Sequence, residues 1–121
     1  MPAAIHIIED DPSVRDAVQE LVASDGRAVY AYDGPAAFFA GAPPGPHDII
    51  VLDIHFPVGS GVEIAERLKR DNPEIRIVVI SGVRSKEFAR ALGAIAPAAS
   101  FRKPIDGPAF AECVRRLSAA T

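Results

Sequence analysis

The 121-residue chain predicts an α/β fold in which five parallel strands alternate with five helices. Short apolar segments recur along the chain, and longer segments with helical periodicity separate them. Two apolar segments, Ile49–Leu52 and Ile77–Ile80, are hydrophobic at every position, which is typical of strands covered on both faces. Right-handed crossovers between such strands favour the order 2-1-3-4-5. The sequence therefore predicts one parallel sheet with helices on both faces.

The strand segments are short and rich in β-branched residues. The expected strands are Ala4–Ile8, Ala28–Tyr32, Ile49–Leu52, Ile75–Ile80 and Ala99–Phe101.

Helical periodicity fills the segments between the strands. Asp11 is the expected N-cap of the first helix, and Pro12 occupies its first position. The apolar stripe of the first helix is Val14, Ala17, Val18, Leu21 and Val22. The next two expected helices are Pro35–Ala40 and Gly61–Arg70. Two more helices are indicated by the apolar stripes Phe88, Ala91, Leu92, Ile95 and Phe110, Cys113, Val114, Leu117. This alternation is that of a flavodoxin-like (βα)5 domain with no second domain.

Composition excludes several classes of protein. The net charge of −3 argues against a broad nucleic-acid-binding surface. A single cysteine, Cys113, cannot form an internal disulfide and suits a reducing compartment. The sequence has no signal peptide and no apolar run near the ~20 residues that span a bilayer. We therefore expect a cytoplasmic protein without membrane or nucleic-acid contacts.

Polar side chains end four of the five predicted strands. The strands end in Glu9-Asp10-Asp11, in Asp53, in Ser81-Gly82 and in Arg102-Lys103-Pro104. The carboxyl ends of parallel strands meet at one edge of the sheet, where such folds bind ligands. We expect these groups to form one site.

Phosphoryl transfer to a carboxylate is the chemistry that unites these groups. Clustered acids repel one another unless a cation lies among them, and oxygen ligands favour Mg²⁺ or Mn²⁺. Asp53 is the expected nucleophile, forming an acyl phosphate. Lys103 and Ser81 would neutralise the phosphoryl oxygens, and Gly82 leaves room for the group.

These residues resemble the receiver domain of two-component response regulators. The resemblance rests on Glu9-Asp10, on Asp53 with Pro57 and Gly61 after it, on Ser81-Gly82 and on Lys103-Pro104. It covers the whole chain, so we expect a single receiver domain over residues 1–121 without an output domain.

The resemblance implies a role for each site residue. Asp10 and Asp53 would ligate Mg²⁺ directly, Glu9 through water, and His55 through its backbone carbonyl. Lys103 would pair with Asp53 before phosphorylation and with the phosphoryl group afterwards.

The resemblance also implies a partner and a switch. A sensor histidine kinase or a histidine phosphotransferase would donate the phosphoryl group, and the chain itself would be a regulator rather than an enzyme. The switching face would comprise the helix around Phe88–Ile95, the strand Ala99–Phe101 and the helix around Phe110–Leu117, which could also mediate dimerisation or contact a downstream protein. The Lys103-Pro104 peptide is expected to be cis.

Strand 5 departs from the family pattern. Ser100 stands where the family usually has a switching aromatic residue, and the neighbouring Phe101 replaces an aliphatic one. The hypothesis is an output face that differs from the common pattern.

Two other functions compete with a phosphorylated receiver. A degenerate receiver would act only as an interaction module, although the set of site residues is complete. A phosphatase of the haloacid-dehalogenase type also uses an aspartate nucleophile, but it places a second acid two residues later, where this chain has His55.

Overall fold

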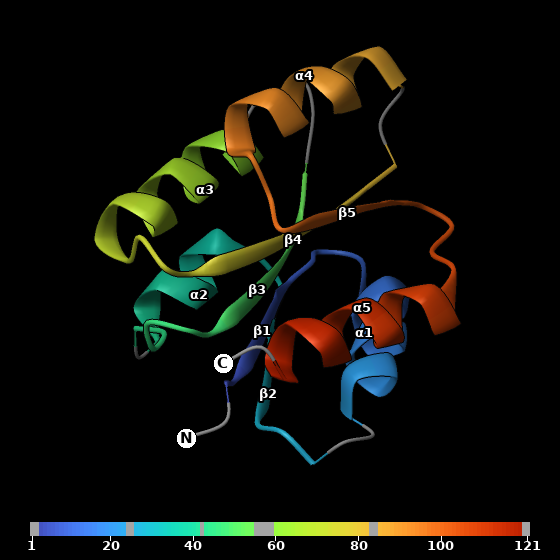
Figure 1. Cartoon of the computed structure of the whole chain (residues 1–121). Coiled ribbons are helices and arrows are strands. Elements are labelled where there is room, and N and C mark those ends of the chain that lie inside the picture. Colours follow the sequence, from blue (N-terminus) through green and yellow to red (C-terminus); the bar gives the residue numbers. More distant parts are fainter. Residues whose placement is uncertain (1–2, 24–25, 42, 55–59, 83–84, 120–121) are drawn as a thin grey trace.

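The structure is a computed structural model that describes residues 3–23, 26–41, 43–54, 60–82 and 85–119. Its strands are β1 (Ile5–Ile8), β2 (Val29–Tyr32), β3 (Ile49–Asp53), β4 (Arg76–Ser81) and β5 (Ala99–Arg102). They form one parallel sheet in the order β2-β1-β3-β4-β5, which confirms the predicted topology (Figure 1).

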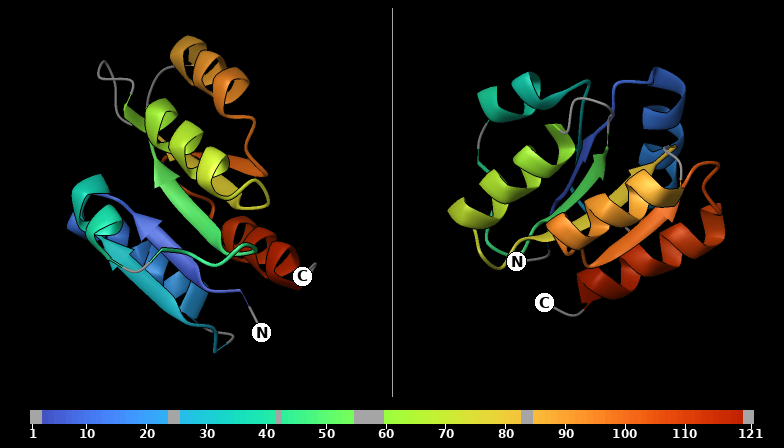
Figure 2. Two further views of the ribbon diagram at one scale, coloured as in Figure 1. Left: turned by 90° about the vertical axis from the view of Figure 1, so that its left-hand side faces the viewer. Right: turned by 90° about the horizontal axis from the view of Figure 1, so that it is seen from above.

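The helices cover the sheet on both faces. They are α1 (Pro12–Ala23), α2 (Pro35–Ala40), α3 (Ser60–Asp71), α4 (Ser85–Ile95) and α5 (Gly107–Ala119). Figure 2 shows α1 and α5 on one side of the strands and α2, α3 and α4 on the other. The molecule therefore has the three layers expected for an α/β fold.

Alternating side chains of the strands form two separate hydrophobic cores. Ile5, Ile7 and Val51 pack against α1 and α5, where Phe110 is completely buried. Ile50 and Leu52 point to the opposite face and pack against α2, α3 and α4. Because both faces are covered, β3 is buried along its whole length, as its continuous apolar sequence predicts.

The strands extend further at their carboxyl ends than the sequence indicates. Asp53 and Ser81 are the last residues of β3 and β4, whereas both were expected just beyond the strands. Asp53 is paired with Ile80 in the ladder, and Ile75 lies before β4 rather than in it. Ladder pairing thus holds the backbone of both polar residues in the sheet.

Two residues expected in the core are less buried than predicted. Ala17 is exposed although it lies on the periodic stripe of α1, and Cys113 of α5 is only half-buried. In α1 the face toward the sheet is narrow, and only Val18 and Val22 are buried. The periodicity located the buried face but overestimated its width.

Helix α1 begins after Asp11, the N-cap that the sequence predicts. The Asp11 carboxylate accepts hydrogen bonds from the N–H groups of Ser13 at 2.9 Å and Val14 at 3.4 Å. A similar cap at α5 was not predicted: Ala109 donates its N–H to the Asp106 carboxylate at 3.1 Å.

A partly buried hydrogen bond joins His6 to Asp48 at the edge of the sheet where the strands begin. His6 Nε2 lies 2.8 Å from Asp48 Oδ2, which also accepts the N–H of Gly45 at 2.9 Å, while Asp48 Oδ1 accepts the N–H of Ala4 at 3.0 Å. Burial raises the pKa of Asp48, but the bonds from His6, Gly45 and Ala4 outweigh it and hold this pKa below its usual range. His6 therefore helps to hold the Asp48 carboxylate at this edge of the sheet.

The end of α4 contains a left-handed residue. Ala96 follows α4 with φ 50°, and its N–H donates to the Leu92 carbonyl at 2.8 Å. Lys69 of α3 donates from Nζ to the carbonyl oxygens of Ile95 and of Ala96, the latter at 2.8 Å. A cation at a helix C-terminus is favourable, whereas a side chain at this φ is strained.

We predict that Ala96→Gly increases the free energy of unfolding by about 0.5–1 kcal/mol, because glycine adopts a positive φ without strain. Ala94→Gly is the matched control: Ala94 is exposed and lies within α4, where the loss of helix propensity should cost about 1 kcal/mol. Urea denaturation of both variants should give changes of opposite sign. Equal losses of stability would contradict the assignment of strain to Ala96.

Candidate functional site

The carboxyl ends of four strands bring the predicted polar residues to one edge of the sheet. Glu9 follows β1, Asp53 ends β3, Ser81 ends β4 and Lys103 follows β5. Glu9, Asp53 and Ser81 are buried, although polar residues at strand ends are usually exposed. The strand ends thus bring together residues that the sequence predicted would lie at one edge of the sheet.

Lys103 pairs with two carboxylates. Its Nζ lies 2.9 Å from Glu9 Oε1 and 3.4 Å from Asp53 Oδ2. The sequence predicted the pair with Asp53 but missed the closer pair with Glu9. Burial lowers the pKa of Lys103, yet the two carboxylates outweigh it and raise this pKa above its usual range.

Three carboxylates converge beside this ammonium group. Glu9, Asp10 and Asp53 each offer an oxygen, and these oxygens all lie within 4.8 Å of one another. Burial, opposed in part by Lys103, raises the pKa of Glu9 from its ordinary 4.5 to about 7, and Asp53 adds to this rise. The cluster holds more negative charge than one lysine offsets, which is the condition under which a divalent cation binds.

Main-chain hydrogen bonds hold the cluster in place. Glu9 donates its N–H to the Tyr32 carbonyl at 3.1 Å, and its Oε2 accepts the N–H of Asp11 at 3.1 Å. The N–H of Lys103 donates to the Ser81 carbonyl at 2.8 Å. The β1–α1 turn and the β5–α5 loop are thereby fixed against the neighbouring strand ends.

A cavity of about 210 Å³ opens beside the carboxylates on the α2–α3 side of the sheet. Its lining includes Asp33, which the sequence analysis did not consider. Asp33 directly follows β2, so the rule that selected the other strand ends would have found it as well. This cavity therefore contains a polar residue from a further strand end.

Other predicted residues lie around the cluster. The Lys103-Pro104 peptide is cis, as expected. A Cβ on Gly61 would lie 3.2 Å from the Cα of Ile54, so glycine lets the first turn of α3 approach the end of β3 closely. Gly82 is more open, since a Cβ there would lie 3.7 Å from Lys103 Cδ.

Strand β5 places its two unusual residues on opposite faces. Ser100 is exposed, whereas Phe101 is half-buried and packs edge-on against Phe110 with ring centroids 5.1 Å apart. His55 and Pro57, predicted to supply a metal-binding carbonyl and to shape its loop, lie outside the described residues.

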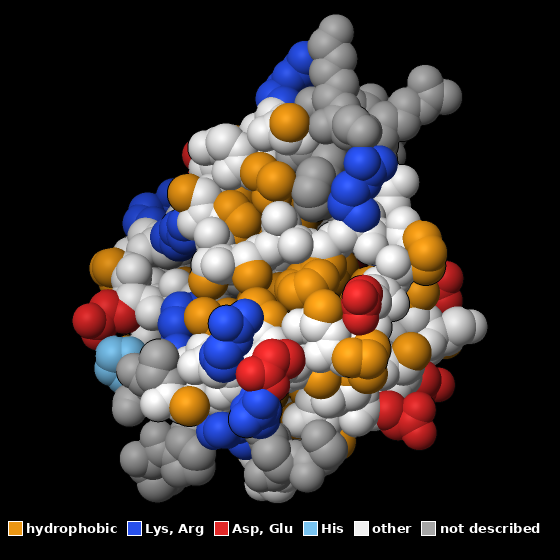
Figure 3. All heavy atoms as spheres, turned by 45° about the vertical axis from the view of Figure 1, so that its right-hand side comes forward, with side chains coloured by type: hydrophobic (Ala, Val, Ile, Leu, Met, Phe, Trp, Pro, Cys, Tyr) orange, Lys and Arg blue, Asp and Glu red, His pale blue; other side chains and the backbone are white. Residues whose placement is uncertain are grey.

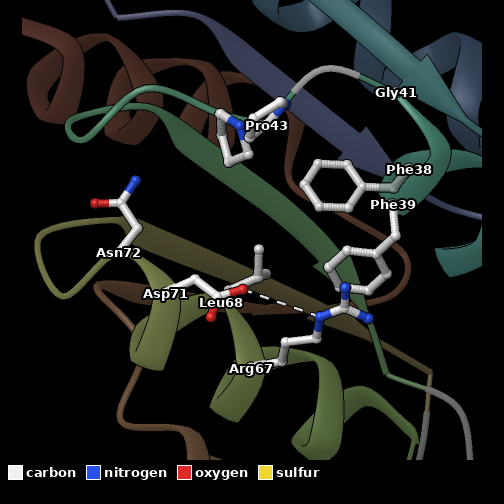
Figure 4. A pocket seen from close by; sticks show the side chains of 9 residues that line it. Phe38, Phe39, Gly41, Pro43, Arg67, Leu68, Asp71 and Asn72 are labelled. Atoms are coloured by element: carbon white, nitrogen blue, oxygen red, sulfur yellow. Dashed lines mark ion pairs between the residues drawn. The ribbon is translucent and has the colours of Figure 1, made fainter.

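A second hollow, of about 270 Å³, lies between α2, α3 and the loop after α2 (Figure 4). Phe38 and Phe39 form one wall, and the Arg67 guanidinium stacks over Phe39 at 3.8 Å from the ring centroid. Its polar groups bind one another: Arg67 Nε lies 4.0 Å from Asp71 Oδ2, and Asn72 donates to the Gly45 carbonyl at 2.8 Å. This hollow lacks the converging charges of the carboxylate cluster.

Comparison with known proteins agrees with the geometry of the strand ends. The family model of the response regulator receiver domain matches residues 5–115. The chain belongs to the response regulator receiver domains. This receiver domain is accordingly a signalling domain. Receiver domains bind a divalent metal, and this chain has an acidic cluster of Glu9, Asp10 and Asp53.

One curated relative supports the same assignment, and solved structures share the fold. The receiver domain is 30% identical over 111 residues to the transcriptional regulatory protein FixJ of Azorhizobium caulinodans, covering 92% of this chain and 53% of FixJ. The response regulator DrrB of Thermotoga maritima superposes with a TM-score of 0.84 at 22% identity, covering 99% of this chain and 54% of DrrB. A response regulator from Colwellia psychrerythraea gives 0.81 at 24% identity, with all of both chains covered.

The chain therefore spans about half of the length of FixJ and of DrrB. Among the described residues, no helix is long and apolar enough to cross a membrane.

We predict that Glu9 makes the metal-free receiver domain less stable as the pH rises. The pKa of Glu9 is raised from its ordinary 4.5 to about 7 in the folded state. Between these two pH values, folded Glu9 keeps a proton that unfolded Glu9 has released. Stability should therefore be highest below this window and fall by about 3 kcal/mol across it.

Glu9→Gln should remove most of this fall, and Glu20→Gln, at an exposed site on α1, should leave it intact. Urea denaturation in the presence of a chelator, at about pH 5 and about pH 8, measures the difference. A Glu9→Gln variant with the pH dependence of the parent would contradict this origin.

Proposed function

We propose that this receiver domain is a phosphoacceptor switch that takes a phosphoryl group on Asp53. The carrying observation is that Asp53 is buried beside two further acids and an ammonium group at a rigid strand end. A buried carboxylate fixed in this way is a good nucleophile for an electrophilic phosphorus atom.

The donor set fits a magnesium or manganese ion. Carboxylate oxygens are the ligands these ions prefer, and three of them converge within 4.8 Å. Asp10 and Asp53 would bind the ion directly, Glu9 through water, and the His55 carbonyl would complete the protein ligands. When bound, the ion would polarise the phosphoryl oxygens and offset their charge.

The residues of the chain then perform the transfer. An oxygen of Asp53 attacks phosphorus, the new O–P bond forms, and the P–N bond to the phosphohistidine of the donor breaks, returning its electron pair to the imidazole. Lys103 would offset charge on the phosphoryl oxygens, and the Ser81 hydroxyl would donate a hydrogen bond to one of them. Gly82 leaves the space that the group occupies.

A sensor histidine kinase or a histidine phosphotransferase is the proposed donor. Such a role suits a cytoplasmic protein, and the lone Cys113 is consistent with a reducing compartment. Because the chain spans about half of FixJ, the receiver domain could regulate either an output domain or a separate protein.

Phosphorylation would change the face formed by α4, β5 and α5. Figure 3 shows hydrophobic side chains gathered across the middle of the side of the molecule on which these elements lie. Such a surface supports dimerisation or binding of a downstream protein. With Ser100 in place of an aromatic residue and Phe101 packed on Phe110, we propose that this face switches without the rotation of an aromatic side chain.

The alternative function is a degenerate receiver that binds partners without phosphorylation. The close approach of Lys103 to both Glu9 and Asp53 favours a receiver that is phosphorylated over a degenerate one. Burying these charged groups costs free energy that a purely structural role does not require.

We predict that incubation with Mg²⁺ and phosphoramidate, which has a P–N bond like phosphohistidine, adds one phosphoryl group per molecule. Intact-mass spectrometry should detect the group in the parent and not in Asp53→Asn. Lys103→Met should slow the transfer at least about tenfold, because charge on the phosphoryl oxygens is no longer offset.

Arg116→Met removes an exposed positive charge on α5 and is the control for lost positive charge. This variant should react as the parent does. No phosphoryl group on the parent would favour the degenerate receiver. Repeated hydrolysis of an added phosphoester would favour a phosphatase.

A further inference from the structure

Arg15 joins the first turns of α1 to the end of β1. Its Nη1 donates a hydrogen bond of 3.0 Å to the main-chain carbonyl oxygen of Glu9, and this contact is partly buried. The Arg15 N–H donates to the carbonyl of Asp11 at 2.9 Å, so the helix fixes the base of the side chain. Arg15 therefore reaches back over the turn that carries the acids.

The carbonyl that Arg15 binds belongs to the peptide unit between Glu9 and Asp10. Because a peptide unit is planar, a hydrogen bond to its oxygen restrains the torsion angles on both sides of the plane. Those torsion angles set the directions in which the two neighbouring carboxylates point. One guanidinium thus restrains the backbone of both acids through a single carbonyl oxygen.

The other polar groups of Glu9 have partners from different elements. Its N–H binds the Tyr32 carbonyl of β2, and its carboxylate accepts the N–H of Asp11 and pairs with Lys103. The carbonyl held by Arg15 completes this set. A loss of the Arg15 contact would release the peptide plane between Glu9 and Asp10, and Asp10 is exposed.

We propose that Arg15 is a positioning residue of the cation site, holding the peptide plane between Glu9 and Asp10 so that both carboxylates face Asp53. The proposal rests on the proposed function, since it concerns the same divalent cation. Residues that orient metal ligands from outside the ligand shell typically change metal affinity by about 10–100-fold when replaced.

A simpler role for Arg15 is to offset negative charge beside the acids. The two roles predict different results for two substitutions. If only charge matters, Arg15→Lys keeps the parent affinity for Mg²⁺ and Arg15→Gln strengthens it, because a repulsive cation is lost. If Arg15 positions the peptide plane, both variants weaken Mg²⁺ binding, because lysine lacks the planar guanidinium that reaches this carbonyl.

Titration with Mg²⁺ by isothermal calorimetry tests this directly. We expect Arg15→Lys and Arg15→Gln to raise the dissociation constant by roughly tenfold or more. Arg116→Lys and Arg116→Gln, at an exposed site in the last turn of α5, should match the parent. Amide NMR spectra without metal should show shifts of Asp10 and Asp11 in the Arg15 variants, and urea denaturation should confirm that all the variants are folded.

An unchanged dissociation constant in Arg15→Lys would overturn the proposal and leave a role in charge compensation. Absence of Mg²⁺ binding by the parent would instead overturn the proposed function, and the positioning role with it. Phosphorylation by phosphoramidate distinguishes the cases further: a positioning defect should be reduced at saturating Mg²⁺, whereas loss of the nucleophile in Asp53→Asn should not.

Discussion

The shared ion pair of Lys103 with Glu9 and Asp53 is the interaction around which the strand ends are organised. The buried carboxylates of Glu9 and Asp53 lie 2.9 Å and 3.4 Å from the Lys103 Nζ, and the exposed Asp10 offers an oxygen within 4.8 Å of theirs. Such a cluster repels itself, so it persists only where the surrounding backbone cannot relax. The parallel sheet supplies that rigidity, because strands covered on both faces place these residues at fixed ladder positions.

The pKa values of buried acids shift in opposite directions at the two edges of the sheet. At the edge where strands begin, Asp48 accepts three hydrogen bonds, and its pKa falls below the usual range. At the edge where strands end, burial outweighs the Lys103 pair and raises the pKa of Glu9. The edge where strands begin therefore favours the ionised form of its acid, whereas the edge where strands end disfavours the ionised form of Glu9 unless a cation offsets its charge.

The sequence predicted the sheet and the four strand ends because both depend on local patterns. Runs such as Ile49–Leu52 are apolar at every position, and the residues that follow them are polar. Topology then places these ends together without any knowledge of the side-chain contacts. For this reason Glu9, Asp53, Ser81 and Lys103 could be grouped before their distances were known.

The contacts that sequence analysis missed join residues that no local pattern connects. Asp48 and His6 are 42 positions apart, and Lys103 reaches Glu9 from the opposite end of the chain. Arg15 lies near Glu9 in the sequence, but its bond is to a backbone oxygen, and a pattern of side chains does not indicate it. Widths of buried faces, as at Ala17, also depend on how neighbouring helices pack.

Strand β5 lies between the strand-end cluster and the outer surface of the molecule. Phe101 is its one aromatic side chain. Its ladder pairs Val79 with Ser100, Ile80 with Phe101 and Ser81 with Arg102. Phe101 faces α5 and is held by Phe110, so the bulk of this strand is directed toward the α1–α5 core rather than toward α4. A displacement of Ser81 would thus reach β5 through its backbone pairing with Arg102. Ser100, on the opposite face from Phe101, is too small to transmit it by packing.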